Sequence, residues 1–139
     1  LWYLIGYAMP QQQIRTFAID RVEDFFTSKE RFITQEEVHF DADAFFQNCY
    51  GITAMDGEAE EIVLSFSPYQ GNYLKTQPIH SSQTILVDNE EEFRISLTLV
   101  NNYEIRNWIL GFGSSVKVEA PETLKGQIRQ ELLKATQRY

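Results

Sequence analysis

The 139-residue sequence predicts an α+β protein whose two parts differ in pattern. In the first part, two apolar stretches flank the polar turn 9–13 (MPQQQ), which predicts an antiparallel hairpin, the minimum unit of a small barrel or sheet. In the second part, the order strand, helix, strand, strand, helix, strand, followed by a further helix, is that of a ferredoxin-like split βαβ unit. Between them, residues 55–59 (MDGEA) are small and polar with an Asp-Gly turn signal, so we expect domains at 1–55 and 56–139.

Composition and charge exclude several classes of protein. The hydrophobic share of 43% and the aromatic share of 14% suffice for a folded core. A net charge of -8 argues against a broad surface for duplex DNA or anionic membranes, although a small basic pocket stays open as an alternative. The single cysteine, Cys49, excludes an internal disulfide and a multi-cysteine metal site, and it fits a reducing compartment. We therefore expect a cytoplasmic protein.

The chain opens with the stretch 1–8 (LWYLIGYA), which is apolar on both alternating faces. It is too short to cross a bilayer, which takes about 20 apolar residues, and we expect no membrane partner. A strand that is apolar on both faces needs neighbours on both faces. We therefore interpret it as an interior strand of a domain whose beginning is absent, and we expect the hairpin to pack on another copy or on the second part of the chain.

Residues 14–26 (IRTFAIDRVEDFF) predict a long strand, or two strands with a bend. Alternation places four of its residues on one face, namely Arg15, Phe17, Ile19 and Arg21. The following segment, 27–40, is polar and mixed. Asp41 and Asp43 are typical N-caps for a short helix over 44–48.

The second part carries clear periodicities. We expect strands at 61–66, 84–87, 93–100 and 116–118, and helices at 68–74, 103–110 and 121–139. Alternation on the strands and helical spacing predict one buried layer formed by Ile62, Leu64, Phe66, Ile95, Leu97, Leu99, Ile105, Trp108 and Ile109. The last helix begins with proline and carries an apolar stripe at Leu124, Ile128, Leu132 and Ala135.

Few residues suit catalysis. The string 39–43 (HFDAD) could hold a metal, but helix capping explains both of its aspartates. The string 80–82 (HSS) lacks the G-x-S-x-G elbow of a hydrolase. The glycine-rich run 111–115 (GFGSS) follows a helix, so we interpret it as a C-cap rather than a phosphate loop. We expect no catalytic residue, no metal and no cofactor.

Arg15 and Arg21 are the best candidates for ligand contact. Phe17 lies between them, and Tyr3 belongs to the same hairpin. Guanidinium groups beside aromatic rings suit a phosphate-bearing ligand with bases that stack. The alternative is that each arginine pairs with a neighbouring acid such as Asp20 or Glu23.

Two groups of motifs carry a resemblance to a known family. The tripeptide 2–4 (WYL), followed after a turn by 14–22 (IRTFAIDRV), resembles the WYL domain family, which is named for such a tripeptide and continues with an R-x-F-x-x-D-R-I/V strand. The second half resembles the WYL C-terminal extension, WCX. Its pattern is echoed in 79–83 (IHSSQ), 108–113 (WILGFG) and 116–122 (VKVEAPE).

The resemblance implies a fold and a role. WYL domains are Sm-like small β-barrels, usually behind an N-terminal winged helix-turn-helix in bacterial transcription regulators, and several sense a nucleic acid such as single-stranded DNA. Residues 1–55 would be the end of a WYL domain truncated at its N-terminus, and 56–139 a whole WCX extension. Operator DNA would be contacted through a missing helix-turn-helix, and the protein would form a homodimer.

The same resemblance implies that a nucleic-acid or nucleotide-like effector is bound by Tyr3, Arg15, Phe17 and Arg21. Two other interpretations stay open. The chain could be a dimerisation module without a ligand of its own. It could also be an enzyme acting on a small molecule, although it lacks an activated nucleophile or paired general acids in a recognisable spacing.

Overall fold

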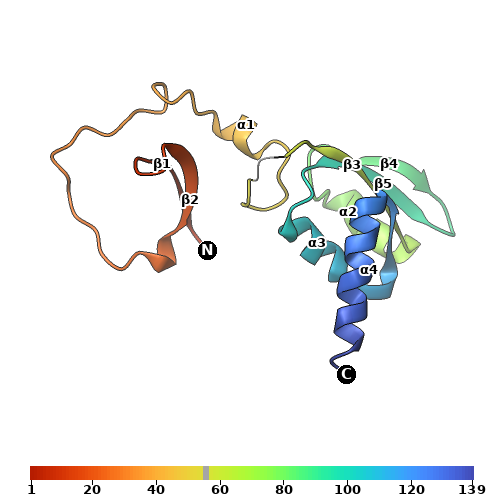
Figure 1. Cartoon of the computed structure of the whole chain (residues 1–139). Helices are drawn as coiled ribbons and strands as arrows, with labels where there is room; N and C mark the ends of the chain where they lie inside the picture. Colours follow the sequence, from red (N-terminus) through yellow and green to blue (C-terminus); the bar gives the residue numbers. More distant parts are fainter. Residues whose placement is uncertain (55–56) are drawn as a thin grey trace. The chain divides into compact units, whose positions relative to one another are not determined.

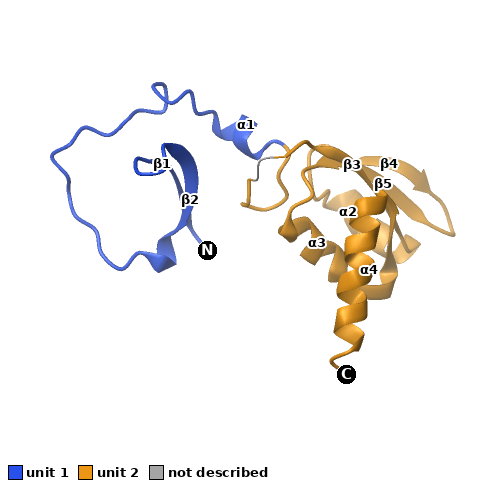
Figure 2. Cartoon of the chain, in the orientation of Figure 1, with its two compact units in different colours: residues 1–47 blue, residues 48–139 orange. Residues whose placement is uncertain are grey.

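A computed structural model describes residues 1–54 and 57–139. The described chain forms two compact units, Leu1–Gln47 and Asn48–Tyr139 (Figure 2). The boundary expected between residues 55 and 56 lies outside the described residues. Helices and antiparallel sheets are both present, which confirms the α+β class.

The first unit contains the predicted hairpin. Strands β1 (Tyr3–Ala8) and β2 (Gln13–Ala18) pair antiparallel around a turn at residues 9–12 (Figure 1). The prediction of a strand running to residue 26 is wrong. Strand β2 ends at Ala18, and a 3₁₀ turn, η1 (Ile19–Arg21), follows it. The cross-strand bonds extend to the Ile19 amide, which donates to the Trp2 carbonyl at 3.0 Å.

The first unit ends with the short helix α1 (Ala42–Phe46). The Asp41 carboxylate accepts hydrogen bonds from the amides of Asp43 and Ala44 at 2.9 and 3.0 Å. This confirms Asp41 as an N-cap, while Asp43 lies within the first turn. Because Asp41 caps it, the helix begins two residues before the predicted start.

The second unit is a four-stranded sheet with helices. The strands are β3 (Glu60–Phe66), β4 (Thr84–Asp88), β5 (Phe93–Leu99) and β6 (Val116–Ala120). They lie in the order β4-β5-β3-β6, and every neighbouring pair is antiparallel. The longer connections contain α2 (Pro68–Thr76), between β3 and β4, and α3 (Tyr103–Leu110), between β5 and β6; α4 (Glu122–Thr136) follows β6 (Figure 1). The register of β4 on β5 shifts between Ile85 and Val87, which marks a bulge on this edge strand.

One face of the sheet carries the hydrophobic core. The register pairs Ile62 with Leu97 and Leu64 with both Ile95 and Val118, so these side chains share a face. Helices α2, α3 and α4 all contribute to the same cluster, through Leu74, Ile105, Ile109, Leu124 and Ile128. Every predicted core residue is buried except one. Trp108 is half-buried, because Ile105 and Ile109 take the inner face of α3.

Trp108 lies instead in an aromatic margin of the core. Its ring packs against Phe112, Tyr50 and Phe66 with centroid distances of 4.7, 5.8 and 6.0 Å. Among the described residues, no helix is long and apolar enough to cross a membrane.

Candidate functional site

The hairpin brings together only part of the predicted ligand set. Its register places Arg15 opposite Gly6 and Phe17 opposite Leu4, so these four residues lie on one face. Tyr3 pairs with Ala18 and therefore lies on the other face. The glycine opposite Arg15 leaves its surroundings open, since a Cβ on Gly6 would meet nothing within 4 Å.

Arg21 is not on the strand face where alternation put it. It lies in the 3₁₀ turn η1, whose backbone does not continue the two-residue alternation of β2. Arg15 and Arg21 are both exposed, and Phe17 is 42% exposed. In the part of the chain that the structure describes, no ion pair joins either arginine to Asp20 or Glu23.

The second unit holds a hydrogen-bonded latch, which we define as residues 48–53 together with Asn102 and Glu104. Asn102 is fully buried, and its Nδ2 donates to the carbonyls of Tyr50 and Thr53, each at 3.1 Å. Its Oδ1 accepts from the Ile105 amide at 2.9 Å and so caps α3. One side chain thus ties the start of α3 to a segment about fifty residues earlier.

Glu104 completes the latch. Its Oε2 accepts from the backbone amides of Ile52 and Thr53 at 3.1 and 2.7 Å. Gly51 approaches the Glu104 carboxylate so closely that a Cβ there would lie 2.5 Å from Cδ. The φ of Gly51 is +85°, so this position favours glycine on both grounds. These residues could not be found from the sequence, because no local pattern predicts a contact between residues about fifty positions apart in the chain.

Cys49 lies in the latch and is buried. Burial, assisted by the negative charge of Glu104, raises the pKa of its thiol above the ordinary value. A raised pKa keeps the thiol protonated and therefore a poor nucleophile. This environment suits a structural cysteine rather than a catalytic one.

In the turn around His80, the side chains of His80 and Ser82 make hydrogen bonds that stabilise the turn. The Ser82 amide donates to His80 Nδ1 at 3.1 Å, and the Ser82 hydroxyl lies 2.7 Å from the same nitrogen. Ser82 Oγ also accepts from the Thr98 amide at 2.9 Å and lies 3.3 Å from its carbonyl. The hydroxyl therefore lies beside both backbone groups of Thr98, two positions beyond the Thr84–Ser96 pair. These bonds occupy His80 and Ser82 in holding the turn against β5.

A carboxylate network covers the sheet face opposite the core. Ser65 Oγ donates to Glu92 Oε2 at 2.7 Å, and Arg94 Nη2 lies 2.8 Å from Glu92 Oε1. The Ser65 hydrogen bond, with a smaller contribution from Arg94, holds the pKa of Glu92 below its ordinary value. Among the described residues, no group of three potential metal ligands comes together.

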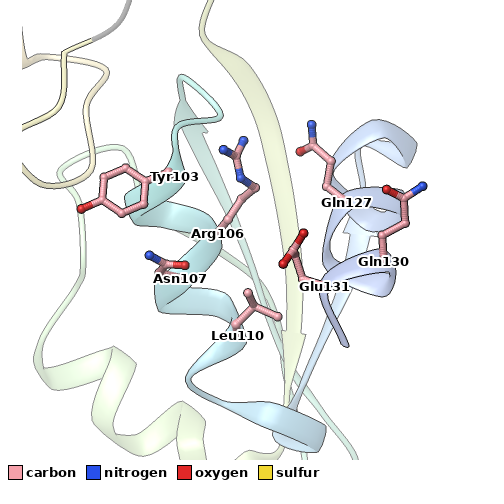
Figure 3. A pocket seen from close by; sticks show the side chains of 7 residues that line it. All are labelled: Tyr103, Arg106, Asn107, Leu110, Gln127, Gln130 and Glu131. Carbon is pink, nitrogen blue, oxygen red and sulfur yellow. The ribbon is translucent and has the colours of Figure 1, made fainter. Parts of the chain in front are cut away.

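A groove lies between α3 and α4, with a volume of about 370 Å³. Figure 3 shows side chains from both helices lining it. They are Tyr103, Arg106, Asn107, Leu110, Gln127, Gln130 and Glu131. The groove therefore offers a guanidinium, three amides, a phenol and a carboxylate around a leucine.

Comparison with known proteins gives one family. The sequence model of the WCX domain matches residues 58–136, more than half of the chain. No curated protein matches the chain. Among solved structures, the chain is similar to proteasome accessory factor B/C (PafBC) of Arthrobacter aurescens, with 18% identity and a TM-score of 0.39. That likeness covers 91% of this chain, which spans 19% of the other.

Proposed function

Since the chain belongs to the WCX domain family, we propose that it is the C-terminal region of a bacterial helix-turn-helix transcriptional regulator. In this proposal, residues 1–55 are part of a WYL domain and sense an effector, and residues 56–139 are the WCX extension and take part in a homodimer. Operator DNA is contacted by a separate domain of the same cytoplasmic regulator. No catalytic role is assigned. The family match over residues 58–136 carries the proposal.

The fold supports the finer assignments. The strand order β4-β5-β3-β6, with α2 and α3 in the two longer connections, is the arrangement expected of a ferredoxin-like unit. The antiparallel pair β1 and β2 supplies two strands of an Sm-like barrel.

The effector in this proposal is a nucleic acid, such as single-stranded DNA, or a nucleotide-like molecule. Arg15 and Phe17 share one open face of the hairpin, where a guanidinium can hold phosphate while a ring stacks on a base. Arg21 would add a second phosphate contact from η1. Tyr3 lies on the opposite face, so its contact would need an effector that reaches around the edge of the hairpin.

Titration of the chain with a fluorescent single-stranded oligonucleotide at two salt concentrations tests this assignment. Each charge-assisted contact contributes about 1.5–3 kcal/mol, so Arg15→Ala or Arg21→Ala should weaken binding about ten- to hundredfold. Each variant should also lower the salt slope by roughly 0.7 for a single strand. Arg129→Ala, an exposed arginine on α4, is the matched control and should leave both quantities unchanged.

A dimerisation module without a ligand is the second candidate. The apolar residues of the hairpin favour it, because Trp2 is 84% and Leu4 59% exposed, and such side chains are common in interfaces. Sedimentation of the chain distinguishes the two roles. A dimer that Trp2→Ser dissociates, combined with no oligonucleotide binding, would replace the sensor assignment by this one.

A further inference from the structure

The groove between α3 and α4 is held in shape by a bridge of three side chains. Asn101 donates from Nδ2 to Gln127 Oε1 at 3.0 Å, which links it to α4. Arg106 on α3 donates from Nη1 to the Asn101 carbonyl and to Asn101 Oδ1 at 3.3 and 3.1 Å. Because both walls are tied to the same asparagine, the groove is formed before any ligand arrives, which reduces the entropic cost of binding.

Arg106 keeps one edge of its guanidinium for a ligand. Its two hydrogen bonds both use Nη1, and no bond among the described residues uses Nε or Nη2. These two N–H groups form the planar fork that holds a carboxylate or phosphate through two parallel hydrogen bonds. Arg106 is partly buried, so the fork is fixed more firmly than on a fully exposed arginine.

The other lining groups suit a flat ring with polar edges. Tyr103 is 53% exposed and lies at the same end of α3 as Arg106 (Figure 3). Aromatic rings stack on nucleic-acid bases, and the amides of asparagine and glutamine match base edges because they both donate and accept. Asn107, Gln127 and Gln130 supply three such amides.

The carboxylate of Glu131 in the groove should repel a bound anion only weakly. Glu131 Oε1 pairs with Lys134 Nζ at 2.7 Å, so its charge is compensated on its own helix. A carboxylate is also the group that accepts hydrogen bonds from the hydroxyls of a ribose. With Arg106 and Glu131 as its charged lining residues, the groove is formally neutral in a chain whose net charge is -8.

We propose that the α3–α4 groove binds a nucleotide unit, with its phosphate on Arg106, its base against Tyr103 and the amides, and its sugar hydroxyls near Glu131. The volume of about 370 Å³ fits one small ligand rather than a long strand. The site lies in the WCX extension and uses no residue of the hairpin. Failure of this proposal would therefore leave the proposed effector contacts of Arg15 and Phe17 on the hairpin unaffected, and the reverse also holds.

Titration of the ¹⁵N-labelled chain with adenosine 5′-monophosphate, followed by NMR, tests the site. We expect saturable shifts of α3 and α4 amides at millimolar ligand or below, with adenosine alone and inorganic phosphate alone each binding at least about tenfold more weakly. Arg106→Lys keeps the charge but loses the fork, and should weaken binding about tenfold. Arg129→Lys is the matched control on α4, and Arg15→Ala should also leave this affinity unchanged.

Two further comparisons define the ligand. Tyr103→Leu should weaken binding of the nucleotide about fivefold and leave binding of phosphate unaltered. A 5′-phosphorylated trinucleotide that binds much tighter than the mononucleotide identifies a strand end as the source, and equal affinities identify a free nucleotide. Absence of saturable shifts, equal affinity for phosphate and nucleotide, or an unaffected Arg106→Lys variant would overturn the proposal.

Discussion

Asn102 combines a helix cap with a tertiary link in one buried side chain. Asn102→Ala removes the cap of α3 and leaves the carbonyls of Tyr50 and Thr53 without their donor. We expect a loss of about 2–4 kcal/mol in the free energy of unfolding, measured by urea denaturation. Asn102→Asp keeps the acceptor for Ile105 but not the donor, so it should be destabilised too. If Asn102→Asp were as stable as the parent, the link to residues 50–53 would contribute nothing.

Glu92 should make the free energy of unfolding depend on pH in the acid range. Its pKa is lowered in the folded chain, chiefly by the Ser65 hydroxyl, so its contribution is fully present above the ordinary value of 4.5 and is lost as the pH falls through the lowered pKa. Ser65→Ala raises that folded pKa toward 4.5. We expect the difference in unfolding free energy between parent and Ser65→Ala to be larger at neutral pH than near about pH 3. A difference that stays constant with pH would show that the hydroxyl does not favour the ionised form.

At the scale of elements, two helix glycines should respond oppositely to alanine. A Cβ on Gly71 of α2 would lie 2.5 Å from Phe93 Cγ, in the core. A Cβ on Gly126 of α4 would meet nothing within 4 Å. Gly126→Ala should therefore stabilise by about 0.5–1 kcal/mol, while overpacking should make Gly71→Ala destabilising by about 1–3 kcal/mol. Thermal melts of both variants check this, and stabilisation by Gly71→Ala would contradict the packing against Phe93.

Elements with strong local periodicity could be predicted from the sequence. Alternation and capping signals gave α3 its bounds, Tyr103–Leu110, and placed β3 and β5 within a residue. The end of β2 could not be predicted, because it depends on where β1 stops pairing rather than on the alternating residues 19–26. The burial of Trp108 was overestimated for a related reason, since helical spacing does not show which of two adjacent positions points inward.

The candidate sites also contain some residues that a local pattern places together and others that only tertiary packing brings together. Alternation along β2 placed Arg15 and Phe17 together, as the register confirms. Alternation along β2 could not show that Tyr3 lies on the other face, because the face on which a β1 residue lies relative to β2 depends on the register between the two strands. The groove and the latch arise from residues 20 to 50 positions apart, and no local pattern reports such contacts. Only packing of α3 against α4 and against residues 48–53 brings them together.

At the scale of the whole molecule, the folding unit of the second part includes the latch. The core cluster lies between Ile62 and Ile128, but the Asn102 side chain that caps α3 is held by residues 50–53, and Trp108 packs on Tyr50. A fragment 48–139 should therefore unfold cooperatively, and a fragment 57–139 should be less stable by about 2–4 kcal/mol. Urea midpoints of the two fragments measure the difference. Equal midpoints would place the start of the folding unit at the proposed boundary between 55 and 56.

The bulge in β4 has a consequence for how copies of this chain meet in concentrated solution. In the sheet of the second unit, as far as the structure describes it, β4 (TILVD) is an edge strand, and its Ile85 and Leu86 are 51% and 50% exposed. A flat edge strand with apolar side chains can template the addition of strands from other chains and so lead to aggregation. The shift between Ile85 and Val87 interrupts its row of free backbone groups, and the Lys75–Asp88 ion pair at 2.7 Å places charge at its end. The edge is therefore protected from templated strand addition even though its side chains are apolar.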